Sequence, residues 1–137
     1  MNDLIKILIV DDEQNILDAF RRNIPKQYDI DYCSDPKKAL DMVKTGEYQI
    51  VFSDISMPGM DGIAFLEGVN DINHEIVKVI VTGFANIQNT LDAINKTNVF
   101  RFLSKPVPTE ILLQTIEDSI QQYKNIMAGK HLFSVEI

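Results

Sequence analysis

The chain of 137 residues contains a single cysteine, no long apolar run and no basic cluster. With Cys33 alone, an internal disulfide is impossible, which fits a reducing compartment such as the cytoplasm. The longest unbroken aliphatic run is Ile7 to Val10, far short of the ~18 residues that a membrane-spanning helix needs. This short run and the early Asp3 also argue against a signal peptide. These absences exclude a disulfide-stapled miniprotein and predict no membrane association.

Acidic side chains are in excess: twenty Asp and Glu stand against thirteen Lys and Arg, for a net charge of −7. Before Ile63, twelve acidic residues stand against seven basic ones. An acidic domain without a basic cluster is a poor binder of nucleic acid, so we expect no direct nucleic-acid contact. Excess negative charge in the first half suits a cation site or a basic partner.

The composition is that of one soluble globular domain, with 45% apolar and 24% charged residues. No internal repeat, low-complexity tract or Gly/Ser-rich linker interrupts the chain. Short apolar runs alternate with segments of helical period, which predicts a parallel sheet covered by helices on both faces, an α/β fold. The expected strands are residues 5–10, 29–33, 50–53, 77–81 and 99–103.

Five helical segments follow these strands. Asp35 and Pro36 provide an N-cap and a proline at the first helical position of the second segment. The third segment runs from about Gly62 to Val69, and the fifth begins near Pro108. The apolar faces of the other four are Ile16, Leu17, Phe20 and Ile24; Ala39, Leu40 and Val43; Ile87, Leu91 and Ile94; and Leu112, Ile116, Ile120 and Tyr123.

The last stretch, from Asn125 to Ile137, does not fit this alternation. Gly129 interrupts it, and Phe133, Val135 and Ile137 alternate weakly, as in a strand.

Polar residues stand at the ends of four expected strands. In an open α/β sheet, ligands bind beyond the carboxyl ends of the strands. Carboxylates follow the first and third strands, a hydroxyl follows the fourth, and a Ser-Lys-Pro sequence follows the fifth. The residues are Asp11, Asp12, Glu13, Asp54, Thr82, Ser104, Lys105 and Pro106.

Asp11, Asp12 and Asp54 would repel one another in a shared crevice. At least one should have a raised pKa unless a cation binds. Oxygen ligands without His or Cys select a hard cation, Mg²⁺ or Mn²⁺. The alternative is that the aspartate pair only caps the following helix.

Lys105 and Thr82 add groups that could hold a tetrahedral oxyanion. Together with an aspartate nucleophile and Mg²⁺, they describe aspartyl-phosphate chemistry. Taken singly, Lys105 could equally be a surface lysine and Thr82 a strand-end hydroxyl.

These residues resemble the receiver domain of two-component response regulators. The matching stretches are Val10-Asp11-Asp12-Glu13, Asp54-Ile55-Ser56-Met57-Pro58-Gly59-Met60-Asp61-Gly62, Val81-Thr82-Gly83 and Ser104-Lys105-Pro106. They occur in the family's order over residues 4–125. The resemblance implies a flavodoxin-like, doubly wound (βα)5 fold with a five-stranded parallel sheet in the order 2-1-3-4-5.

The resemblance also implies a role for each site residue. Asp54 would be the phosphoacceptor. Asp12, Asp54 and the Ser56 backbone carbonyl would bind Mg²⁺, for which Mn²⁺ can substitute, and Asp11 would act through metal-bound water. Thr82 and Lys105 would hold the phosphoryl oxygens.

Phe102 stands where the family places its switch aromatic, and Phe102 and Thr82 would form the switch. The Lys105–Pro106 bond would be cis, as is usual in the family.

Three other functions are compatible with a doubly wound fold. A flavodoxin-like nucleotide or FMN binder would need a Ser/Thr/Gly-rich loop after the first strand, where this chain has Asp11-Asp12-Glu13. A haloacid-dehalogenase-like phosphatase would place Asp-x-Asp after its first strand, whereas Asp54-Ile55-Ser56 follows the third. A receiver-like module that is never phosphorylated is the third, and no residue favours it.

The sequence therefore predicts a cytoplasmic, phosphorylation-activated signalling switch that catalyses only its own phosphorylation and dephosphorylation. The phosphodonor would be a sensor histidine kinase or a histidine phosphotransfer protein. Phosphorylation would change the face made by the fourth helix, fifth strand and fifth helix. Through this face the chain would control an output domain or a downstream partner, or would form a homodimer. Residues 1–125 would form the receiver domain. Residues 126–137 would be a C-terminal tail, an appended helix or the start of a linker to an absent output domain.

Overall fold

The computed structural model describes residues 5–55, 62–83 and 97–136, with side chains described as far as residue 130. The expected helix carrying Ile87, Leu91 and Ile94 lies outside the described residues. The described elements are β1 (Lys6–Val10), α1 (Gln14–Asn23), β2 (Asp29–Cys33), α2 (Pro36–Val43), β3 (Ile50–Ser53), α3 (Gly62–Ile72), β4 (Val77–Thr82), β5 (Arg101–Ser104) and α5 (Thr109–Glu136).

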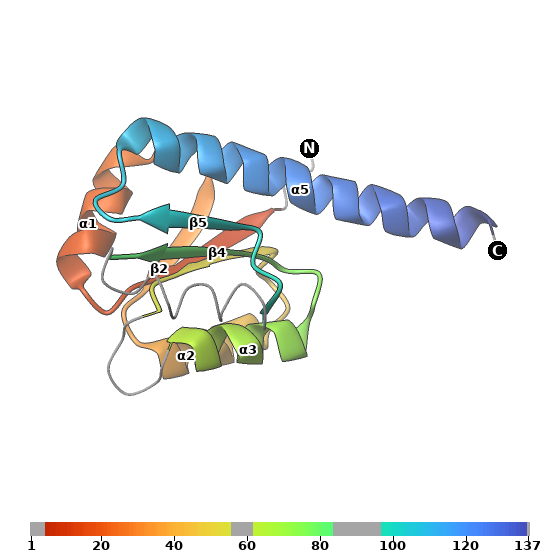
Figure 1. The fold of residues 1–137 in the computed structure, drawn as a ribbon, viewed down its shortest axis with the longest axis horizontal. Helices are drawn as coiled ribbons and strands as arrows, with labels where there is room; N and C mark the ends of the chain where they lie inside the picture. Colours follow the sequence, from red (N-terminus) through yellow and green to blue (C-terminus); the bar gives the residue numbers. More distant parts are fainter. Residues whose placement is uncertain (1–4, 56–61, 84–96, 137) are drawn as a thin grey trace.

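The five strands form one parallel sheet in the order β2-β1-β3-β4-β5, which confirms the predicted fold class. β3 and β4 are buried at every residue, because helices cover both faces of the sheet. Figure 1 shows α2 and α3 on one face and α1 and α5 on the other. The expected strand bounds hold to within two residues at each end.

Two apolar cores follow from the alternation of side chains along the strands. One joins the sheet to α2 and α3 through Val51, Phe65 and Ile80. The other joins the opposite face to α1 and α5 through Phe52, Phe20 and Ile116. As the sequence predicts, Asp35 caps α2: its side chain accepts a hydrogen bond from the backbone N–H of Lys37, 3.0 Å away, and Pro36 stands in the first turn.

The weak strand-like alternation of the C-terminal stretch does not produce a strand, and of the alternatives that the sequence left open the structure shows the appended helix. Residues 125–136 continue α5, which runs past the sheet in Figure 1. The helical spacing of Ile116, Ile120 and Tyr123 continues to Ile126, and these residues all pack on one core. Gly129 lowers helix propensity by only ~1 kcal/mol relative to alanine, so it does not end the helix. Lys130 Nζ lies 3.0 Å from a Glu75 carboxylate oxygen ahead of β4, which ties this part of α5 to the domain.

Candidate functional site

The carboxyl ends of the strands bring the predicted site residues to one edge of the sheet. Asp11 directly follows β1 and Asp54 directly follows β3, and both continue the ladder of backbone hydrogen bonds. The Asp54 N–H donates to the Val10 carbonyl at 3.1 Å, and the Asp11 N–H donates to the Cys33 carbonyl at 3.2 Å. Their side chains therefore start from backbone that the sheet holds in place.

Three carboxylates converge at this edge. Asp11, Asp12 and Asp54 each offer an oxygen, and these oxygens lie within 4.8 Å of one another. Asp11 and Asp54 are buried, at 2% and 5% exposure, while Asp12 is half-buried. The group has the all-oxygen donor set that a hard divalent cation prefers, so it could bind a metal ion.

Lys105 places a positive charge between two of these carboxylates. Its Nζ lies 2.7 Å from Asp11 Oδ2 and 2.8 Å from Asp54 Oδ2. Glu13 lies farther off, at 3.7 Å. The Lys105 N–H donates to the Thr82 carbonyl at 2.8 Å, and the Lys105–Pro106 peptide bond is cis, as the resemblance implies. The ends of β4 and β5 thus fix the backbone from which the ammonium reaches the acidic group.

The electrostatics of the site favour an added cation. Burial raises the pKa of Asp11 above its ordinary value, although the contacts with Lys105 and the Glu13 N–H oppose that rise. A raised pKa for one carboxylate confirms the sequence expectation, but burial contributes more than repulsion from Asp54. For Lys105, burial lowers the pKa, but the hydrogen bonds and charges of Asp11 and Asp54 outweigh it, so the net shift is upward.

Among the described residues of the site, Gly62 is a glycine that its neighbours leave no room to replace. A Cβ there would lie 2.2 Å from Ile55 Cα and 2.3 Å from the Asp54 carbonyl oxygen. The Gly62 N–H also donates to the Ile55 carbonyl at 3.2 Å. The start of α3 therefore packs directly on the backbone that carries Asp54. Ser56, predicted as a ligand through its carbonyl, lies outside the described residues.

Thr82 and Phe102 lie on the same face of the sheet. Thr82 is fully buried at the end of β4 and pairs in register with Ser104, while Phe102 pairs with Ile80. Phe102 is half-buried and packs against the core on the α2 and α3 side. The roles predicted for these two residues remain predictions.

An apolar cavity beside the site was not anticipated from the sequence. It has a volume of about 420 Å³ between α1 and the segment joining β5 to α5. Its walls include Ile16, Ala19 and Phe20 of α1, with Lys105 and Pro106 opposite. The spacing of Ile16 and Phe20 was assigned to the core. Ala19, which the sequence shows, and the half-buried state of Ile16, which the structure shows, indicate that the apolar face of α1 extends beyond the part that the core covers.

The fold and the site define a class of protein: a doubly wound parallel α/β domain with an acidic group and a lysine at the carboxyl edge of its sheet. The profile of the response regulator receiver domain matches residues 7–117. The chain belongs to this family, which acts as a signalling switch and not as a conventional enzyme.

Two relatives and one structural neighbour illustrate the similarity. The chain is 31% identical to the phosphoglycerate transport system transcriptional regulatory protein PgtA of Salmonella typhimurium, over 95% of this chain and 31% of that protein. It is 30% identical to the transcriptional regulatory protein ZraR of Escherichia coli, over 93% of this chain and 29% of that protein. The CheY-like receiver domain protein of Methanospirillum hungatei superposes with a TM-score of 0.83 and 26% identity, over 90% of this chain and 98% of that one.

The chain spans less than a third of the length of these two transcriptional regulators. Among the described residues, no helix combines the length and hydropathy needed to cross a membrane.

Proposed function

We propose that this chain is the phosphorylation-activated switch of a two-component phosphorelay, with Asp54 as the phosphoacceptor. The observation that carries the proposal is the buried Asp54 carboxylate, which shares one edge of the sheet with Asp11 and Asp12 and lies 2.8 Å from the ammonium of Lys105. Such a site can accept a phosphoryl group and balance its charge.

In the proposed reaction, an Asp54 carboxylate oxygen attacks the phosphorus of a phosphohistidine. The new O–P bond forms as the N–P bond breaks, and the imidazole leaves with the bonding electrons and takes up a proton. Hydrolysis of the acyl phosphate later returns Asp54 to the carboxylate and releases inorganic phosphate. The chain would thus catalyse only its own phosphorylation and dephosphorylation.

Asp11, Asp12 and Asp54 fit a Mg²⁺ ion, for which Mn²⁺ could substitute, because all their donor atoms are oxygens. The Ser56 carbonyl completes the protein ligands in this proposal. A bound divalent ion would supply positive charge against the phosphoryl oxygens. Lys105 would contribute a second positive charge, and the Thr82 hydroxyl would donate a hydrogen bond to the phosphoryl group.

The proposed switch uses Thr82 and Phe102. Phosphorylation replaces one negative charge by about two and adds strong acceptors. Thr82 would move toward the phosphoryl oxygens. This movement would vacate space on the face of the sheet where both Thr82 and Phe102 lie, and the Phe102 ring would turn inward to fill it. A structure with beryllofluoride bound at Asp54 tests this step: an inward Phe102 ring supports it, and a ring unmoved from the half-buried position contradicts it.

The partners of this switch follow from its surfaces. A sensor histidine kinase or histidine phosphotransfer protein would dock over the 420 Å³ apolar cavity, because Lys105 and Pro106 in its wall place it beside the acidic group.

An output domain, or a downstream protein, would respond to β5, α5 and the preceding helix, and this same face could pair two copies. Since the relatives are described as transcriptional regulatory proteins, transcription is the proposed output of a longer protein. The free Cys33 thiol suits the cytoplasm.

Intact-protein mass spectrometry after treatment with acetyl phosphate and Mg²⁺ tests the proposal. One phosphoryl adduct is expected on the wild type, and none without Mg²⁺ or on Asp54→Asn. No adduct on a folded, Mg²⁺-binding wild type, even with a histidine kinase as donor, would favour a module that signals by binding alone.

A further inference from the structure

A groove of about 240 Å³ lies beside the outer edge of β2, away from the acidic group. Its floor combines aliphatic residues with the rings of Tyr28 and Tyr32, and two cations, Arg21 and Lys26, stand in its wall. Both cations are exposed, and within the described part of the chain neither forms an ion pair. In a chain of net charge −7, this is a local site of positive charge without a counterion.

The guanidinium of Arg21 is held over the Tyr32 ring, with its carbon 4.5 Å from the ring centroid. Stacking on the ring restricts the rotamers of the arginine side chain. Less side-chain entropy is therefore lost when its N–H groups bind an anion. Tyr32 is itself half-buried in the core on the α1 face. The groove is therefore partly preorganised for an anionic group.

The backbone of β2 offers a second set of binding groups. β2 is the terminal strand of the described sheet. The Cys33 carbonyl accepts from Asp11, so the peptide groups of Cys33 point toward β1. Because alternate residues of a strand direct these groups to opposite sides, Ile30 and Tyr32 direct theirs to the outer edge, which no described strand covers. An open edge is a template for another strand.

The two faces of β2 differ in charge. Ile30 and Tyr32 lie on the α1 face beside the groove, whereas Asp31 lies on the opposite face, bound to Lys6 and Tyr48. Asp29 alternates with Ile30 and is exposed. A strand added at this edge would meet Arg21 and Lys26 on one face. On the other face it would meet Asp29 and Asp31, whose two charges are only partly balanced by Lys6. Acidic residues at every second position match this arrangement of charge.

We propose that the outer edge of β2 and the groove of Arg21 and Lys26 bind an extended segment of a partner protein in which acidic residues alternate with neutral ones. The segment would pair with the backbone of Ile30 and Tyr32 and direct its carboxylates into the groove. The aspartates on the other face would reject a continuous acidic tract, which makes the site selective for the alternating pattern. This binding is separate from phosphoryl transfer at Asp54.

The test uses the whole chain labelled with ¹⁵N and a synthetic, end-blocked peptide Glu-Val-Glu-Thr-Glu-Val. Saturable chemical-shift changes centred on β2 are expected, with slower hydrogen exchange at the amides of Ile30 and Tyr32. A peptide of the same composition, with its three glutamates grouped at one end, should bind about tenfold more weakly.

Paired charge reversals separate this site from general electrostatics. The double variant Arg21→Glu, Lys26→Glu should weaken binding about tenfold. The matched variant Lys37→Glu, Lys38→Glu makes the same charge change at exposed positions of α2 and should leave affinity within about twofold. Equal weakening by both pairs, equal binding of the two peptides, unprotected Ile30 and Tyr32 amides, or no saturable binding would each overturn the proposal.

Discussion

Lys105 and Asp54 are 51 positions apart in the sequence, yet Lys105 Nζ donates to Asp54 Oδ2 at 2.8 Å. The contact joins the end of β5 to the end of β3 across the end of β4. Since both groups are largely buried, at 16% and 7% side-chain exposure, water screens their attraction weakly. The same ammonium contacts Asp11, so one cation balances two buried carboxylates.

Replacing Lys105 by methionine should lower stability and slow phosphorylation but strengthen Mg²⁺ binding. Without Mg²⁺, the buried carboxylates lose their counterion, and the free energy of unfolding should fall by about 2 kcal/mol. Mg²⁺ should bind at least about threefold more tightly, because a neighbouring positive charge is removed. Phosphorylation by acetyl phosphate should slow by at least about tenfold.

Urea unfolding, calorimetric Mg²⁺ titration and phosphorylation rates measure these changes. Lys44→Met is the control, since Lys44 is 60% exposed and, within the part of the chain that the structure describes, forms an ion pair with Asp41 of α2 alone. Weaker Mg²⁺ binding by Lys105→Met would contradict the proposed arrangement of charges.

Alanine at Gly62 should damage the site through the backbone. The new Cβ would meet Ile55 Cα at 2.2 Å and the Asp54 carbonyl at 2.3 Å, and neither is a flexible side-chain end. We expect a loss of about 2–3 kcal/mol in the free energy of unfolding and slower phosphorylation of Asp54. Gly129→Ala is the matched control, because open space surrounds its Cβ position in α5; it should stabilise by about 0.5–1 kcal/mol. Equal stability of the two variants in urea would show that the close approach at Gly62 is absent.

Lys78 should make stability rise with pH between neutrality and pH 9.5. It is 1% exposed in β4, and its ammonium donates to the Ile76 carbonyl at 2.8 Å. Burial lowers the pKa of Lys78 from 10.5 to about 8. Between these values the unfolded chain binds more protons than the folded one, so folding is favoured as pH rises.

The gain from pH 7 to 9.5 should be about 2 kcal/mol, measured by urea unfolding as the difference between the wild type and Lys78→Met. The variant lacks the buried ammonium and should be the more stable protein at pH 7. A pH profile identical for the two proteins would mean that Lys78 keeps its ordinary pKa.

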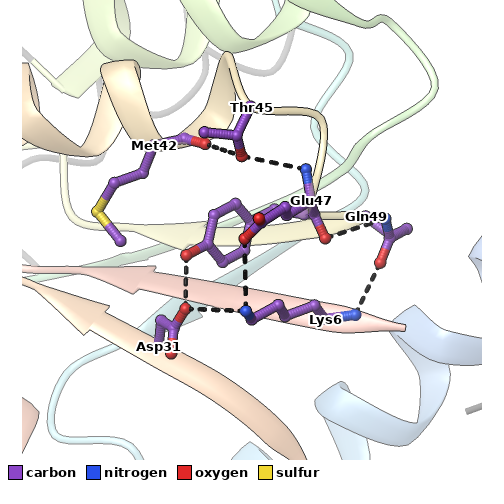
Figure 2. A network of polar contacts seen from close by, with 7 residues as sticks. Lys6, Asp31, Met42, Thr45, Glu47 and Gln49 are labelled. Atoms are coloured by element: carbon purple, nitrogen blue, oxygen red, sulfur yellow. Dashed lines mark hydrogen bonds and ion pairs between the residues drawn. The ribbon is translucent and has the colours of Figure 1, made fainter. Parts of the chain in front are cut away.

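The polar network at the opposite end of the sheet should contribute stability without affecting phosphorylation. Figure 2 shows Lys6 between Asp31 and Glu47, with its backbone N–H donating to Gln49. The buried Tyr48 hydroxyl donates to Asp31 Oδ2 at 2.5 Å, which ties the edge strand β2 to the segment before β3.

Tyr48→Phe should lower the free energy of unfolding by about 1–2 kcal/mol, because the Asp31 carboxylate loses a donor. Tyr123→Phe is the control, since the Tyr123 hydroxyl makes no hydrogen bond among the described residues. Phosphorylation rates should be unchanged in both variants. A slower rate for Tyr48→Phe alone would show that the two ends of the sheet are coupled.

The fold was largely predictable because its signals are local. β1, β3 and β4 are close to continuous apolar runs, with polar residues at their ends and Lys78 inside β4, and none of them has a polar face, as strands covered on both sides require. Asp11, Asp12, Asp54 and Lys105 were identifiable because parallel strands bring their carboxyl ends to one edge whatever the intervening sequence.

Other features depend on contacts that the sequence pattern does not encode. The sequence left the state of residues 125–136 open between a linker and an appended helix, because three alternating apolar residues imitate a strand, while the contact between Lys130 and Glu75 that ties α5 to the domain spans 55 positions. The apolar cavity beside Lys105 was missed for another reason. Apolar residues spaced three and four positions apart mark the apolar face of a helix, but they do not show how much of that face the core covers. The buried Lys78 stands between valines, and only the tertiary structure shows that its ammonium is held by a nearby carbonyl.

Borohydride trapping of the phosphorylated residue tests the central claim most directly. The chain would be treated with acetyl phosphate and Mg²⁺, reduced with borohydride, which converts an aspartyl phosphate to homoserine, and mapped by peptide mass spectrometry. The account predicts homoserine at position 54 alone, and none in Asp54→Asn. Homoserine at position 11 or 12 of the wild type, or its appearance elsewhere in Asp54→Asn at the wild-type yield, would contradict it.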